Sequence, residues 1–97
     1  MKKLARTQVD DIIRFAEAKE IDNVVGIMVR LVPEALAELK ALTWLGRDMD
    51  NPKHWDALVI EASYKLDAET ARYLADDPHL AAILRKGIDA LESAGRL

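Results

Sequence analysis

Apolar residues recur at helical spacing between three prolines, and this pattern most strongly limits what the chain can fold into. Apolar side chains three or four residues apart lie on one face of an α-helix. Asn51 and Asp77, both good N-cap residues, precede Pro52 and Pro78, and proline is tolerated at the first helical position. Pro33 is also predicted to begin a helix. The chain is therefore predicted to be all-α. The largely apolar stripes are Val9, Ile12, Ile13 and Ala16; Leu36, Leu39, Leu42 and Thr43; Trp55, Leu58, Val59, Ala62 and Leu66; and Leu80, Ile83, Leu84, Gly87, Ile88 and Leu91.

The size and composition of the chain fit one domain. Its 97 residues are 51% hydrophobic and 32% charged, so a packed core is expected rather than disorder. We predict a compact single-domain bundle of four to six helices with short connections, spanning residues 1–97. Residues 1–6 are expected to be poorly ordered, as chain ends usually are. The helix over 33–45 and the helix from Pro52 should form an antiparallel pair, with the helix from Pro78 closing the core.

Two segments allow two interpretations each. Residues 24–32 are rich in β-branched residues, as strands are, but a lone strand would lack a partner in a helical chain. We therefore expect a short buried helix there. Residues 52–75 fit either one long helix or two helices divided at Asp67. Gly46 and Gly95 each follow an apolar-periodic stretch, so both are predicted to be left-handed residues that end helices.

Composition and charge exclude several classes of function. The chain has no cysteine, which excludes disulfides, thiolate zinc sites and cysteine nucleophiles, and its two histidines exclude an all-histidine metal site within one chain. The formal net charge of −3 disfavours general nucleic-acid binding. No apolar run approaches the ~20 residues that cross a bilayer, and the first residues do not resemble a signal peptide. We expect a cytoplasmic protein with no metal, no cofactor and no catalytic residues.

Two short segments carry a resemblance to a known family. Leu45-Gly46-Arg47-Asp48 follows a predicted helix, Trp55 lies a few residues further on, and Tyr73-Leu74-Ala75 lies ahead of a proline. These segments resemble the Leu-Gly-Arg-Gly and Tyr-Leu-Leu motifs of a small bacterial all-helical domain family of unknown function. The aspartate and the alanine stand where that family usually has its second glycine and second leucine. The resemblance implies an all-helical domain and carries over no catalytic or binding residue.

The most site-like residue is Arg47, which Trp44 and Trp55 flank in the sequence. An arginine fork between aromatic rings can bind a carboxylate or a phosphate, and Tyr73 is a further ligand-binding candidate. The alternative assigns Trp55 to the core and Arg47 to a local ion pair. The nearby carboxylates that would supply this ion pair are Asp48, Asp50 and Asp56.

Three functions follow from these observations. The first is a non-catalytic protein-interaction or self-association module, because no catalytic constellation is present and residues 24–32 are more apolar than a short exposed helix needs. Its candidate interface residues are Val25, Ile27, Met28 and Val29. The second is a small-molecule binder that uses a pocket of Trp44, Arg47 and Trp55. The third is a nucleic-acid-binding regulator, which the charge opposes because Arg85 and Lys86 are the only positive residues between Pro78 and Ser93.

Overall fold

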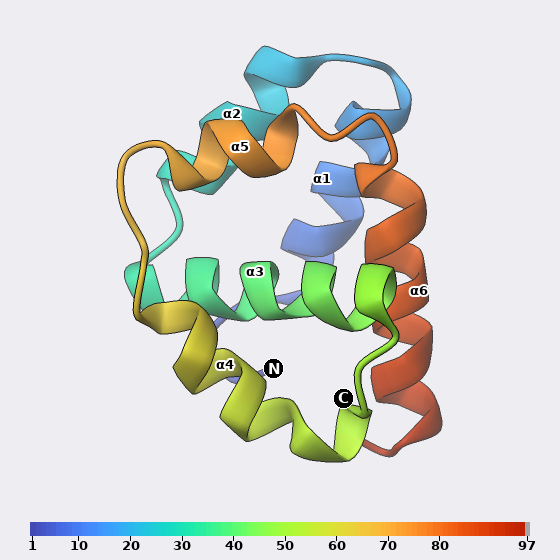
Figure 1. Ribbon diagram of the computed structural model, residues 1–97. Helices are drawn as coiled ribbons and strands as arrows, with labels where there is room; N and C mark the ends of the chain where they lie inside the picture. Colours follow the sequence, from blue (N-terminus) through green and yellow to red (C-terminus); the bar gives the residue numbers. More distant parts are fainter. Residues whose placement is uncertain (97) are drawn as a thin grey trace.

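The computed structural model describes residues 1–96 and is built from helices, with no strand in that range (Figure 1). The all-α prediction is confirmed, and residues 1–96 hold six α-helices, at the upper end of the predicted range. The elements are α1 (Arg6–Glu17), α2 (Ile21–Val29), α3 (Pro33–Asp48), a short 3₁₀ turn η1 (Pro52–His54), α4 (Trp55–Ser63), α5 (Thr70–Ala75) and α6 (Leu80–Ser93).

Helix α3 is the central element of the bundle. It packs most extensively against α6 and α4, while α1 lies against α6 and α2, and α5 lies against α2. Helices α3 and α4 run in broadly opposite directions, as the predicted antiparallel pair requires (Figure 1). The apolar stripes meet at the centre, where Leu39, Leu42 and Leu84 are fully buried. The spacing of apolar residues therefore identified the core-facing side of each long helix.

Both ambiguous segments are resolved as helices. Residues 24–32 contain most of α2, so the expected short helix is confirmed, but only Val24 and Met28 are buried and Val29 is exposed. Residues 52–75 form two helices, because the chain leaves α4 at Ser63 and re-enters helix only at Thr70. The Asp67 carboxylate stabilises this break by accepting hydrogen bonds from the backbone N–H of Glu69 at 2.9 Å and from the Thr70 hydroxyl at 3.3 Å.

The prediction that Gly46 ends a helix is wrong. Helix α3 continues through it to Asp48, and Met49 adopts the left-handed conformation at the C-cap, with φ at 54°. Gly46 is instead buried where α3 crosses α6, and a Cβ placed on it would lie 1.9 Å from the carbonyl oxygen of Ile83. On the facing helix, a Cβ on Gly87 would lie 2.6 Å from the carbonyl oxygen of Leu42. The two glycines therefore allow the two helices to approach closely.

The predicted end of α6 is confirmed, whereas its start lies two residues later than predicted. Gly95 has φ at 68°, as expected for a left-handed residue after a helix. At the start, Asp77 accepts a hydrogen bond from the backbone N–H of His79 at 2.8 Å, but Pro78 lies in a turn and α6 begins at Leu80. The aspartate thus caps the turn before the helix rather than the first turn of the helix itself.

The N-terminal segment, expected to be poorly ordered, is tied to α3 by a buried carboxylate. The backbone N–H groups of Lys2, Lys3 and Leu4 each donate a hydrogen bond of 2.7 Å to Glu38. Glu38 is 5% exposed and Leu4 is 3% exposed. Buried charge of this kind persists only when hydrogen bonds compensate it, and three backbone donors do so here.

None of the helices in the described part of the chain is both long enough and apolar enough to span a membrane. The cytoplasmic location expected from the sequence stays a prediction.

Candidate functional site

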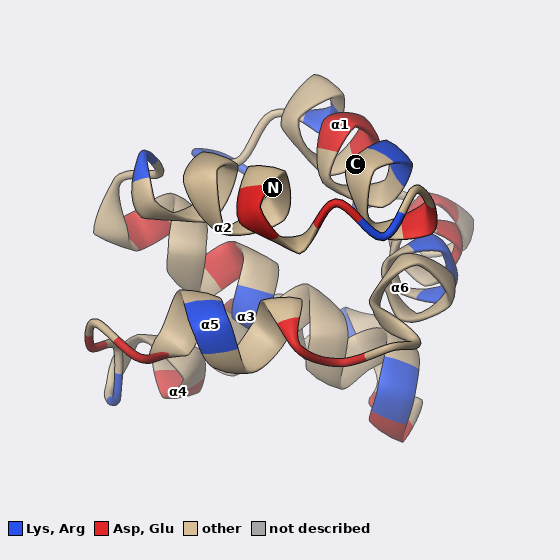
Figure 2. Cartoon of the chain, turned by 90° about the horizontal axis from the view of Figure 1, so that it is seen from above, with Lys and Arg blue, Asp and Glu red and all other residues tan. Residues whose placement is uncertain are grey.

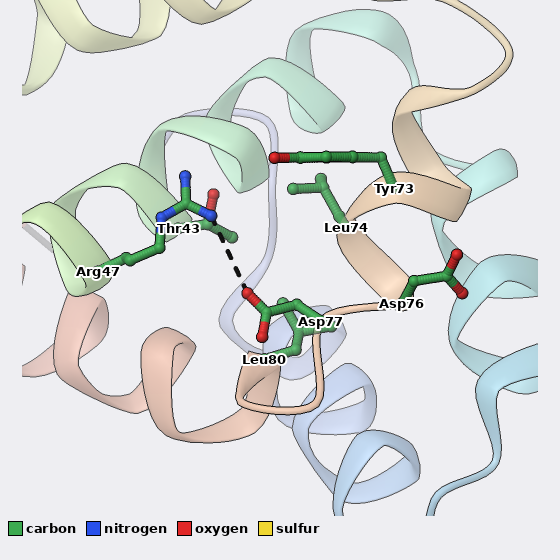
Figure 3. Close-up of a pocket in the computed structure, with 7 residues that line it drawn as sticks. All are labelled: Thr43, Arg47, Tyr73, Leu74, Asp76, Asp77 and Leu80. Carbon is green, nitrogen blue, oxygen red and sulfur yellow. Dashed lines mark ion pairs between the residues drawn. The ribbon is translucent and has the colours of Figure 1, made fainter.

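A cavity of about 300 Å³ opens where α3, α5 and the start of α6 meet (Figure 3). Two of the predicted ligand-binding residues, Arg47 and Tyr73, lie on its wall. The full lining consists of Thr43, Arg47, Tyr73, Leu74, Asp76, Asp77 and Leu80. The cavity therefore combines one guanidinium, two carboxylates and a phenol with apolar side chains.

Three segments of the chain bring these side chains together. Thr43 and Arg47 are four residues apart on α3, so they lie on the same face of that helix. Tyr73 comes from α5, and the two aspartates lie in the connection that leads into α6. The turn at His79 fixes Asp77, because one of its carboxylate oxygens accepts the His79 backbone N–H. The other oxygen faces Arg47.

The Arg47 guanidinium has carboxylates near it but no hydrogen bond to them. Its Nε lies 3.6 Å from Oδ1 of Asp48, and its Nη1 lies 4.0 Å from Oδ2 of Asp77. Both distances exceed those of ordinary N–H···O hydrogen bonds. The Arg47 side chain is 39% exposed, and ion pairs this open are worth about 0–1 kcal/mol. The pairing with Asp48 matches the expected alternative, whereas Asp77 was not foreseen as a partner.

Apolar groups form the remainder of the cavity. Leu74 and Leu80 are 4% and 2% exposed and provide its buried floor. Tyr73 is 70% exposed and extends from α5 alongside Leu74, with its hydroxyl directed towards α3 (Figure 3). The Thr43 hydroxyl already donates to the Lys40 carbonyl at 2.6 Å. Arg47, Asp77 and Tyr73 therefore offer polar groups to a ligand, whereas the Asp76 carboxylate points away from Arg47 (Figure 3).

Neither predicted tryptophan lines this cavity. Trp55 is 4% exposed and belongs to the core, which confirms its structural interpretation. Trp44 is partly buried, and the Lys40 ammonium lies 5.5 Å from the centre of its ring, within cation–π range. The predicted pocket of both tryptophans with Arg47 is therefore wrong in composition, because Tyr73 and Asp77 stand at the guanidinium instead. From the sequence, Asp77 is predicted only as the N-cap residue before Pro78, not as a partner of Arg47.

A second depression is an apolar groove of about 320 Å³ at the other end of α5. It lies between the connection from α2 to α3 and the connection from α4 to α5, which run close to each other in Figure 1. The groove is lined by Met28, Val29, Leu31, Pro33, Leu36, Leu66, Asp67, Ala68 and Ala71. We refer to this set as the apolar groove.

The four predicted interface residues divide between surface and core. Val29 is 64% exposed and lines the apolar groove. Met28 also belongs to the groove lining, but its side chain is fully buried and packs in the core, so it offers no exposed surface to a partner. Val25 and Ile27 are partly buried and pack against the core. Val32, which was not singled out as a candidate, is 51% exposed beside the groove.

Charged residues of both signs are interspersed over the helices rather than gathered on one face (Figure 2). On α6, Arg85 lies 2.6 Å from the Glu17 carboxylate of α1, so one of the two cations between Pro78 and Ser93 is already paired. This distribution does not favour a surface that follows a phosphate backbone. Among residues 1–96, no three histidine, aspartate or glutamate side chains gather as a metal site would require.

The chain belongs to the family described as Protein of unknown function (DUF3775), whose model matches residues 19–93. This membership confirms the resemblance to an uncharacterised family. No curated protein and no solved structure gives a significant match to the chain.

Proposed function

We propose that this chain is a non-catalytic interaction module that self-associates through the apolar groove. The observation that carries the proposal is the composition of the groove, in which Asp67 is the sole charged residue of the lining. Val29 and Val32 add exposed apolar surface at its edge. Contiguous exposed apolar surface with a polar rim is typical of a protein–protein contact.

The charges near the groove suit a second copy of the same chain. In a two-fold dimer, the same patch meets itself, so each charge on one copy can face an opposite charge on the other. Arg30 stands between two groove residues in the sequence, Val29 and Leu31, without itself lining the groove, and Asp67 lies on the opposite side. Both residues are exposed. A dimer about this groove therefore allows Arg30 of each copy to approach Asp67 of the other.

The groove offers little chemistry for a reaction. Its apolar side chains supply no acid, base or nucleophile. The Asp67 carboxylate already accepts two local hydrogen bonds within its own turn. These features support binding rather than catalysis.

Light scattering on a size-exclusion column, over a series of protein concentrations, tests the proposal. We expect the mass to rise from 10.9 kDa towards twice that value as the concentration increases. Val29→Lys should weaken the association at least about tenfold, because a charged ammonium would have to be desolvated in the interface. The substitution should not unfold the chain, since Val29 is exposed and a cation suits the end of a helix.

Ile60→Lys provides the matched control. Ile60 is 56% exposed on α4 and lies outside the groove lining, so this variant should associate like the unchanged chain. A strictly monomeric mass up to high micromolar concentration would remove the proposal. Equal loss of association in both lysine variants would show that any added charge has this effect and would also argue against the groove.

A further inference from the structure

The cavity between α3, α5 and α6 holds a positive and a negative group side by side. Nη1 of Arg47 and Oδ2 of Asp77 are 4.0 Å apart and point towards each other across the wall (Figure 3). Within residues 1–96, the guanidinium donates no hydrogen bond, and Oδ2 of Asp77 accepts none, because the His79 backbone uses Oδ1. Both groups therefore keep their hydrogen-bonding capacity for a ligand.

Their separation restricts the charge pattern of that ligand. A purely anionic molecule at Arg47 would face the carboxylate of Asp77, while a purely cationic one would face the guanidinium. A molecule with both charges satisfies both receptors. Because the receptors are 4.0 Å apart, the two charges of the ligand must also be adjacent, as they are in an α-amino acid. A long ω-amino acid separates its charges too widely to meet both.

The apolar part of the cavity indicates which side chain such a molecule would carry. The buried floor is formed by Leu74 and Leu80, and the Tyr73 ring extends alongside Leu74 towards α3. Aliphatic walls favour an aliphatic side chain. The volume of about 300 Å³ is at the small end of the range of ligand pockets, about 300–1,000 Å³, which suits a ligand of this size.

We propose that this cavity binds a free aliphatic α-amino acid. Its carboxylate lies on the Arg47 guanidinium, and its ammonium lies on Oδ2 of Asp77. Its side chain packs on Leu74 and Leu80, and the Tyr73 ring lies beside it. The site is separate from the apolar groove, so it does not depend on self-association.

Titration of the isotope-labelled chain, followed by amide chemical shifts, tests this with matched small molecules. The probes are L-leucine, 4-methylpentanoate (leucine without its ammonium), 3-methylbutylamine (leucine without its carboxylate) and 6-aminohexanoate (both charges, far apart). We expect saturable shifts with L-leucine at the amides of Arg47, Tyr73 and Asp77. The other probes should bind at least about tenfold more weakly, because each loses a charge-assisted hydrogen bond.

Three variants locate the binding site. Arg47→Gln removes the receptor of the carboxylate. Asp77→Asn removes the charge but keeps a side-chain oxygen that can accept the His79 backbone N–H. Both should weaken L-leucine binding at least about tenfold. Arg14→Gln is the control, since Arg14 is an exposed arginine on α1 outside the cavity, and its variant should bind L-leucine unchanged.

Absence of saturable shifts with L-leucine would overturn the proposal. Equal binding of 4-methylpentanoate would show an anion contact with Arg47 alone, and equal binding of 3-methylbutylamine a cation contact with Asp77 alone. Either result would refute a zwitterion site. So would unchanged L-leucine affinity in Arg47→Gln or Asp77→Asn. None of these outcomes bears on the oligomeric state, so the test of self-association remains independent.

Discussion

Substitution of Gly46 by alanine should disrupt the closest contact in the bundle, where α3 crosses α6. The added Cβ would lie 1.9 Å from the carbonyl oxygen of Ile83 and 3.0 Å from the backbone nitrogen of Gly87. These are backbone atoms of a facing helix, so no side-chain rotation relieves the contact. Restoring a carbon–oxygen distance of about 3.4 Å requires the two helices to separate locally by about 1.5 Å.

The free energy of this change follows from two opposing effects. Overpacking that forces backbone shifts costs about 1–3 kcal/mol and occasionally more, and a contact with rigid backbone belongs at or above the top of that range. Alanine gains about 1 kcal/mol over glycine in helix propensity. We therefore expect Gly46→Ala to lower the free energy of unfolding by about 2–3 kcal/mol. For a domain of this size, that corresponds to a fall in Tm of about 8–24 °C.

Gly26→Ala is the control, because Gly26 is also inside a helix but faces open space. A Cβ on Gly26 would meet no atom within 4 Å. Only the propensity gain remains there, so this variant should be stabilised by about 0.5–1 kcal/mol. Thermal and urea denaturation, both followed by far-UV circular dichroism, measure both variants. The reasoning fails if the two alanines shift Tm in the same direction, or if Gly46→Ala leaves it unchanged.

Three further predictions concern a buried carboxylate, the apolar core and a surface ion pair. Glu38→Gln should lower the free energy of unfolding by about 1.5–3 kcal/mol in urea titrations, because an amide cannot accept all three backbone N–H groups. Glu34→Gln, at an exposed glutamate of the same helix, should leave it nearly unchanged. Leu84→Asp should abolish the cooperative thermal transition, since Leu84 is fully buried and an unpaired buried charge costs several kcal/mol. The hydrogen bond from Arg6 to Glu92 raises the pKa of Arg6 in the folded chain. The folded chain is therefore stabilised at every pH below the pKa that Arg6 has in the unfolded chain. This stabilisation is lost only at strongly alkaline pH, as Arg6 loses its proton. Arg6→Gln should accordingly cause a small loss of Tm that is constant across neutral pH and disappears in high salt.

The helices were predictable because their signals are local. Apolar spacing and the residues around each proline lie within a few positions of each other, so a single sequence contains them. The same locality explains the error at Gly46. A glycine near the end of an apolar stripe fits a left-handed C-cap and a close helix crossing equally well. Only the contact with Ile83, on a helix far away in the sequence, distinguishes the two interpretations. At Gly95 a Cβ would meet no described atom within 4 Å, and the local interpretation holds.

The contacts of Glu38 and Arg47 were not predictable for a related reason. In the sequence, Glu38 is one of several charged residues next to the apolar stripe of α3, and nothing nearby marks it as buried. Its hydrogen-bond partners lie more than thirty residues earlier in the chain. Arg47 was identified as site-like because of its neighbours in sequence. In the structure, the residues that share the cavity with Arg47 include Tyr73 and Asp77 and neither tryptophan. Tyr73 belongs to another helix, and Asp77 belongs to the connection after it. The sequence therefore identified Arg47 as site-like, but its neighbours in space depend on how the helices pack.

Helix α5 connects the two candidate sites and decides which substitutions can separate them. Its Ala71 lines the apolar groove and its Leu74 lines the cavity, three residues apart on a helix of six residues. A helix this short is not stable alone and keeps its position through packing. A change at either residue would therefore move both sites and could not assign an effect to one of them. Val29 lines only the groove and Arg47 only the cavity, so their variants separate the two proposals. If leucine nevertheless changed the association of the unchanged chain, linkage would require association to change leucine affinity by the same factor.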